Sequence, residues 1–86
     1  MNDKVNVNIV VPEIDKQYNM LLPINKKMRT IINLWNKSVS ELSSGNFPKS
    51  ENCKLYNSET METYDDNTLL YNTNIRNGTK LILLSY

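Results

Sequence analysis

The sequence lacks histidine altogether and contains a single cysteine, Cys53. One cysteine cannot form an internal disulfide, and without histidine the chain cannot build a zinc site from its own cysteine and histidine ligands. A nucleophilic cysteine needs a base that holds it as thiolate, so we expect Cys53 to be a small, partly buried residue near the start of a strand. These absences favour a reducing compartment and a protein that is not an enzyme and binds no metal or other cofactor.

The chain also lacks an excess of charge and a long apolar run. Its 10 basic and 9 acidic residues give a net charge of +1. This is too little positive charge to indicate binding to nucleic acid or to an anionic membrane. No apolar stretch approaches the roughly 20 residues of a membrane span, and the beginning, MNDKVNVNIV, lacks the layout of a signal peptide. We therefore expect a cytoplasmic protein that neither binds nucleic acid nor inserts into a membrane.

At 86 residues the chain is shorter than most domains, so residues 1–86 are expected to form one domain. A chain of this size can bury one two-layer core but has no room for a deep substrate cavity as well. Length therefore favours a binding surface over an active-site cleft.

The first quarter of the sequence predicts a β-hairpin. Residues 4–11, KVNVNIVV, alternate between apolar and polar residues, which is typical of a half-buried strand with Val10 among the residues on its outer face. After an interruption at residues 12–15, the stretch QYNMLLPI predicts a second strand with Tyr18, Met20 and Leu22 on its core face. Pro23 cannot donate a ladder hydrogen bond, so it closes this strand or lies at its edge.

The next segment changes period and predicts an α-helix from Lys26 to about Ser44. Its apolar residues recur every three or four positions, and they are Met28, Ile31, Ile32, Trp35, Val39 and Leu42. Asn25 is the predicted N-cap and Gly45 the glycine that ends the helix. We expect Trp35, like Met28 and Leu42, to pack in the core rather than to anchor a partner.

The second half of the chain is more polar. Short strands are predicted around Leu55 and around Met61, with a turn at residues 57–58 between them. Residues 64–68 are a predicted loop in which Asp65 and Asp66 form a solvated turn, because the spaced acidic ligands of a calcium loop are missing. Leu69 and Leu70 are expected to return to the core, and residues 77–78, Asn-Gly, predict a tight turn.

The closing segment KLILLSY predicts a final strand, with Leu81 and Leu83 on one side and Ile82, Leu84 and Tyr86 on the other. Because the first and last strands are the most apolar, we expect them to lie side by side and parallel in the middle of the sheet. One helix stripe can cover one face of one sheet. The predicted fold class is α+β, a β-grasp with one mixed sheet packed on one α-helix.

The sequence resembles the ubiquitin family in two segments. INKKMRTIINLW stands where that family begins its helix, and NIRNGTKLILL stands where it enters its last strand. The most specific part is the closing pattern Leu70, Ile75, Gly78, Leu81 and Leu83, in which a short loop places an isoleucine in the core before a glycine turn. The resemblance covers nearly the whole chain and implies the ubiquitin-like form of the β-grasp.

A closer likeness is to the small bacterial ubiquitin-like proteins YukD and EsaB, which accompany type VII secretion. Shared features are a tyrosine-led second strand that ends in proline and a helix in which Trp35 is followed by Ser38-Val39-Ser40. This resemblance implies a noncatalytic accessory or regulatory component that binds a cytoplasmic portion of a secretion membrane component. The polar segment 47–67 is longer here than in that family, which puts family contacts there in doubt.

Three alternatives remain at this point. Conjugated ubiquitin-like proteins and sulfur carriers need an extended tail that ends in two glycines, whereas this sequence ends in Leu84-Ser85-Tyr86, so we do not expect that activity. The domain could instead be a protein-interaction module unrelated to secretion, or a nucleic-acid-binding module that a salt-dependent gel shift would reveal.

Two groups of residues are candidates for protein binding. The first is the apolar set on the outer sheet face, Val10, Tyr56, Ile82, Leu84 and Tyr86, where a contiguous patch invites a partner. By resemblance, ubiquitin-family domains commonly bind through this face. The alternatives to partner binding at this face are that it forms a weak homodimer or that the loops cover it. The second group is Lys26, Lys27 and Arg29, since cations in a first helical turn oppose the helix dipole and suit an acidic partner.

Overall fold

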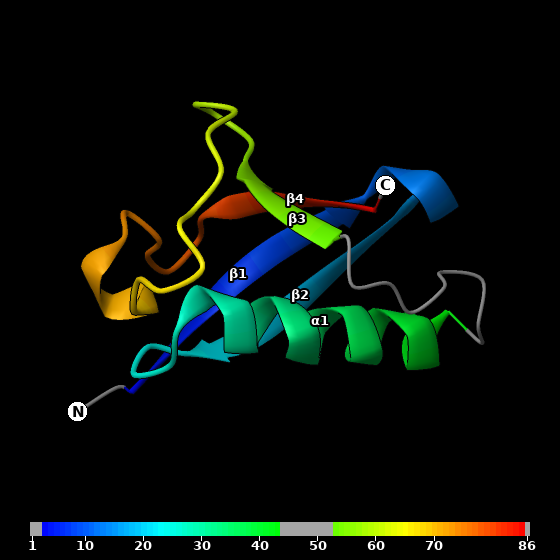
Figure 1. The fold of residues 1–86 in the computed structure, drawn as a ribbon. Helices are drawn as coiled ribbons and strands as arrows, with labels where there is room; N and C mark the ends of the chain where they lie inside the picture. Colours follow the sequence, from blue (N-terminus) through cyan, green and yellow to red (C-terminus); the bar gives the residue numbers. More distant parts are fainter. Residues whose placement is uncertain (1–2, 44–52, 86) are drawn as a thin grey trace.

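The computed structural model describes residues 3–43 and 53–85, which form a four-stranded sheet with one helix packed on one face (Figure 1). The elements in chain order are β1 (Lys4–Val11), a 3₁₀ turn η1 (Pro12–Ile14), β2 (Lys16–Pro23), α1 (Met28–Leu42), β3 (Cys53–Asn57), a second 3₁₀ turn η2 (Leu70–Asn72) and β4 (Lys80–Ser85). The helix carries the apolar stripe that the sequence predicts, but it begins at Met28 and ends at Leu42 and is therefore shorter than the predicted span from Lys26 to about Ser44. No helix among the described residues is long and apolar enough to cross a membrane.

The sheet has the strand order β2-β1-β4-β3. The central strands β1 and β4 are parallel, while β2 pairs antiparallel with β1 and β3 pairs antiparallel with β4. Asp15 adopts a left-handed conformation, with a φ of 52°, and closes the β1–β2 hairpin, which ends at Pro23. The predicted α+β β-grasp, with the last strand beside the first, is therefore confirmed.

The core lies between α1 and the sheet and consists of Val7, Ile9, Val11, Leu22, Met28, Ile31, Trp35, Val39, Leu55, Leu70, Ile75, Leu81 and Leu83. Trp35 is 1% exposed, so its predicted core role is confirmed. The prediction for Leu42 was wrong. Its side chain is 58% exposed because it belongs to the final helical turn, beyond Val39, which is the last helix residue in the core.

The start of α1 also differs from the prediction. The N-cap is Lys27, which makes no side-chain capping bond, so Asn25 does not cap the helix. The first amides of the helix are instead bound by a distant loop, since Met28 N donates to Thr68 O at 2.9 Å and Arg29 N to Asp66 O at 3.1 Å. A backbone segment thus replaces the expected side-chain cap. Gly45 lies outside the described residues.

The short strand predicted around Met61 is reduced to a single bridge between Thr63 and Tyr56. Residues 58–60 form a turn, and Met61 has a φ of 59° and lies exposed, a left-handed conformation that a strand does not tolerate. The sequence predicts that Leu69 and Leu70 both return to the core, but Leu69 is 38% exposed and only Leu70 is buried there. Ile75 is fully buried and Gly78 has a φ of 89°, as the closing pattern of the sequence predicts.

Candidate protein-binding surface

The sheet face opposite α1 carries an apolar patch on three of its four strands, β1, β4 and β3. Val10 lies beside Ile82 in the parallel register, and Tyr56 lies beside Ile82 in the antiparallel register. Leu84 follows two residues along β4 and therefore points to the same side. All four side chains are half-buried. We call these four residues the outer patch. Tyr86, predicted as a fifth member, lies outside the described residues.

Basic residues border the outer patch, and the sequence prediction did not include them. Lys54 lies opposite Leu84 in the β3–β4 register, and Lys80 precedes Ile82 by two residues on β4. Both lysines are exposed. Each stands two residues from a patch member, so strand alternation was the signal that could have found them. The patch therefore has an apolar centre with positive charge at its border.

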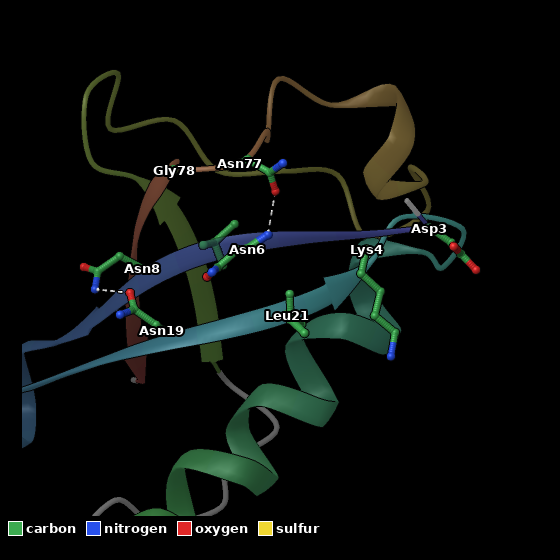
Figure 2. A pocket seen from close by; sticks show the side chains of 9 residues that line it. Asp3, Lys4, Asn6, Asn8, Asn19, Leu21, Asn77 and Gly78 are labelled. Carbon is green, nitrogen blue, oxygen red and sulfur yellow. Dashed lines mark hydrogen bonds between the residues drawn. The ribbon is translucent and has the colours of Figure 1, made fainter. Parts of the chain in front are cut away.

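The other half of the same face is polar and forms a shallow hollow (Figure 2). Asn8 Nδ2 donates to Asn19 Oδ1 at 3.1 Å, which joins β1 to β2, and the side-chain Oδ1 of Asn77 accepts from Asn6 N at 2.8 Å. Leu21 stands at the border of this hollow and is 63% exposed. These asparagines tie strands and turns together, and they separate the outer patch from Leu21.

The second predicted group, Lys26, Lys27 and Arg29, lies at the beginning of α1 and is exposed. The Arg29 guanidinium donates from Nη2 to Asn67 Oδ1 at 3.2 Å, which places it against the loop before η2. The group belongs to the helix layer, whereas the outer patch is on the opposite side of the sheet. The structure therefore does not unite the two predicted groups into one surface.

Cys53 is half-buried at the first position of β3, as the sequence predicts. Asn36 Nδ2 donates to its Sγ at 3.0 Å. Burial raises the pKa of the Cys53 thiol, and the negative charge of Glu13 raises it further. This environment favours the protonated thiol over the nucleophilic thiolate.

Asp65 and Asp66 are exposed in a turn, where Asp65 Oδ1 accepts from Asn67 N at 2.8 Å. In the part of the chain that the structure describes, no three histidine, cysteine, aspartate or glutamate side chains gather as metal ligands do. The acidic pair therefore forms a hydrogen-bonded turn, in agreement with the sequence prediction.

No protein-family model and no curated protein matches the sequence. Solved structures do match it over its whole length. The chain is similar to the EccD5 ubiquitin-like domain from Mycobacterium xenopi, with a TM-score of 0.78 and 18% identity over 99% of this chain and 97% of that one. It is also similar to the ubiquitin-like domain of the Mycobacterium tuberculosis type VII secretion protein EccD1, with a TM-score of 0.74 and 16% identity over 99% of this chain and 100% of that one.

A third match is a chain of the MycP5-free ESX-5 inner membrane complex, with a TM-score of 0.72 and 15% identity. It covers 99% of this chain but 21% of that chain, so the domain corresponds to about a fifth of the membrane-complex component. Likeness at these identities shows a shared fold, and the fold is the ubiquitin-like β-grasp.

Proposed function

We propose that this domain is a noncatalytic ubiquitin-like accessory or regulatory component of a type VII secretion system, which binds a cytoplasmic portion of a membrane component. Three observations support the proposal. The fold matches the ubiquitin-like domains of two EccD proteins, a match of the same kind occurs within an inner membrane complex, and the sequence resembles YukD and EsaB.

The observation that carries the binding role is the outer patch, formed by Val10, Tyr56, Ile82 and Leu84. Strand pairing places Val10, Ile82 and Tyr56 in one row across three strands, and Leu84 lies next to this row on β4. A flat partner can therefore cover all four side chains together. Burying apolar surface contributes about 25 cal/mol per Å², and a few central apolar or aromatic residues usually supply most of the binding energy. The lysines at the border favour a partner with acidic residues around an apolar centre.

The binding role is tested by one substitution on each half of the same face. Ile82→Lys places a charge in the outer patch, and Asn6→Lys places the same charge in the polar hollow. We expect Ile82→Lys to weaken capture of the membrane component at least tenfold and to reduce export by the secretion system, because a desolvated lysine opposes the contact. Asn6→Lys should leave both unchanged. Circular dichroism of both variants checks that each is folded.

The identity of the partner is tested by photo-crosslinking in cells. A photoreactive phenylalanine derivative at Tyr56 should capture a cytoplasmic portion of a secretion membrane component, which mass spectrometry then identifies. The same group at Lys37, exposed on α1, is the control. Capture from position 37 and not from position 56 would reject the outer patch. Capture of proteins unrelated to secretion from position 56 would reject the secretion role while leaving the binding surface in place.

A further inference from the structure

Backbone groups of β2 along one edge of the sheet have no partner among the described residues, and their direction follows from the hydrogen bonds of β1. Asn8 N donates to Thr79 O at 3.0 Å, and Gly78 N donates to Asn6 O at 2.8 Å. Even-numbered residues of β1 thus bond toward β4. Successive residues of a strand direct their backbone groups to opposite sides, so the odd-numbered residues of β1 bond to β2.

The β1–β2 register pairs each odd-numbered residue of β1 with an even-numbered residue of β2. The N–H and C=O groups of Gln17, Asn19 and Leu21 therefore point away from β1, off the edge of the sheet. Within residues 3–43 and 53–85, β2 pairs with β1 alone, and no hydrogen bond from a turn or loop reaches these three backbones. All three side chains are exposed as well.

Natural sheets usually protect such an edge with charged residues, proline, a bulge or a very short strand. The register of β2 runs without a bulge over eight residues, and the stretch from Gln17 to Leu22 has no charged residue. Lys16 and Pro23 stand at the two ends, outside this stretch. The edge is therefore long, regular and uncharged, which is the pattern of a strand that pairs with another strand.

Apolar side chains lie on both faces of this edge. On the outer face, Leu21 projects from β2 beside Asn19 (Figure 2). On the other face, Tyr18 and Met20 of β2 are only partly buried. Leu34 lies about 200° around the helix axis from Asn36, which bonds to Cys53 of β3, and is therefore on the flank of α1 away from β3. Leu34 is 50% exposed. A strand added to β2 would cover apolar surface on both sides.

We propose that β2 pairs with β2 of a second copy of this chain, antiparallel and around a two-fold axis at Asn19. This two-fold register pairs all three residues whose backbone groups point off the edge. Gln17 lies opposite Leu21 of the second copy, Leu21 opposite its Gln17, and Asn19 opposite its Asn19. Each of these pairs exchanges two backbone hydrogen bonds.

The pattern of charge and proline supports a second copy as the occupant. In this register Lys16 lies opposite Leu22 of the second copy, so no like charges meet, and Pro23 lies outside the paired stretch. The strand that this edge accepts must be extended, uncharged and itself open at one edge, and the stretch of β2 from Gln17 to Leu22 meets each condition. A contact that uses the same surface on both copies closes at the dimer and does not grow into a filament. The outer patches of both copies then lie on one continuous sheet face.

Analytical ultracentrifugation of the purified chain, from micromolar to millimolar concentration, tests the proposal. We expect a reversible monomer–dimer equilibrium. Asn19→Asp and Asn19→Lys should each weaken the dimer at least tenfold, because two like charges meet at the axis. An equimolar mixture of the two variants should restore dimerisation, since opposite charges then meet. Asn33→Asp and Asn33→Lys, which place the same charges on the exposed side of α1, should dimerise like the original chain.

A further variant separates pairing from folding. Asn19→Pro removes an N–H that points off the edge and leaves the ladder to β1 intact, so it should fold with an unchanged circular dichroism spectrum and remain monomeric. A chain that stays monomeric at millimolar concentration would overturn the proposal. So would a dimer that persists in the Asn19 charge variants, or a mixture of those variants that stays monomeric. None of these results bears on the outer patch, whose partner is tested separately.

Discussion

The two outer strands of the sheet, β2 and β3, differ in what happens to their free edges. β3 is five residues long, and the chain turns back along it, so that Asn57 N donates to Glu62 O at 3.0 Å and Tyr56 forms a bridge with Thr63. β2 is eight residues long and has no such cover among the described residues. The protein's own polar loop thus closes the β3 edge at Tyr56 and Asn57, whereas the described residues leave the β2 edge open.

Asn57 is the residue that closes the β3 edge. It is 7% exposed, and its Oδ1 accepts from Glu59 N at 2.9 Å and from Thr60 N at 3.3 Å. Its Nδ2 donates to Tyr64 Oη at 3.1 Å, and Tyr64 Oη in turn donates to Asn74 Oδ1 at 2.8 Å. One buried amide therefore joins the turn, the returning segment and the loop before β4.

Because the two edges differ, we expect an asparagine-to-alanine substitution to lower the free energy of unfolding much more at the β3 edge than at the β2 edge. Asn57→Ala should lower the free energy of unfolding by about 2 kcal/mol, because it removes a buried amide together with its three hydrogen bonds to Glu59, Thr60 and Tyr64. Asn19→Ala, at the open edge, should change it by less than about 0.5 kcal/mol, as is usual for exposed positions. Urea denaturation of dilute protein measures both. Equal losses at the two positions would mean that the β3 loop does not stabilise its edge.

The pH dependence of stability that arises from Tyr64 provides a second test of the β3 edge. Burial raises the pKa of the Tyr64 phenol, the bond from Asn57 lowers it, and the charge of Glu62 raises it, with a net increase. A raised pKa means that folding favours the neutral phenol. This contribution to stability is fully present below the pKa of the unfolded chain, about 10, and is lost as the pH rises through the higher pKa of the folded protein.

We therefore expect the urea midpoint to fall between neutral and strongly alkaline pH, and to fall less in Tyr64→Phe, which has no titrating group at this position. At neutral pH, Tyr64→Phe should lower the free energy of unfolding by about 1 kcal/mol through the lost hydrogen bonds. Tyr71→Phe is the matched control, because Tyr71 is exposed. The same alkaline loss in Tyr64→Phe as in the original chain would contradict the assignment.

The sequence predicts the regular elements well because their periodicity is local. Alternation along β1 and β4 places Val10, Ile82 and Leu84 on the outer face, and the helical period places Trp35 in the core. The four residues of the outer patch were therefore predictable, and the same alternation puts Lys54 and Lys80 on this face, whereas the position of Lys54 beside Leu84 depends on pairing between strands.

The errors are concentrated where distant segments decide the structure. Asn25 does not cap α1, because carbonyl groups about forty residues later in the chain take that role. Met61 is not in a strand, because the Asn57 side chain turns the backbone immediately before it. Side-chain hydrogen bonds to the backbone compete with strand pairing, and composition does not reveal which of the two is formed.

The smallest predicted effect concerns Cys53, at the first position of β3. Because burial and the charge of Glu13 both raise the pKa of its thiol, iodoacetamide should modify Cys53 more slowly at neutral pH than it modifies a cysteine placed at the exposed Gln17 of β2 in a Cys53→Ser background. Thiolate is the reactive form, so a raised pKa lowers the rate.

Glu13→Gln removes one of the two causes and lowers the pKa, so the alkylation rate of Cys53 should increase by a factor of about two, as a partly screened charge interaction gives. Asp15→Asn removes the same charge two residues later, at a left-handed position that asparagine tolerates, and should leave the rate unchanged. Equal acceleration in both variants would show that net charge, rather than the position of Glu13, controls the thiol. No acceleration in Glu13→Gln would leave burial as the sole cause of the raised pKa and of the low reactivity of Cys53.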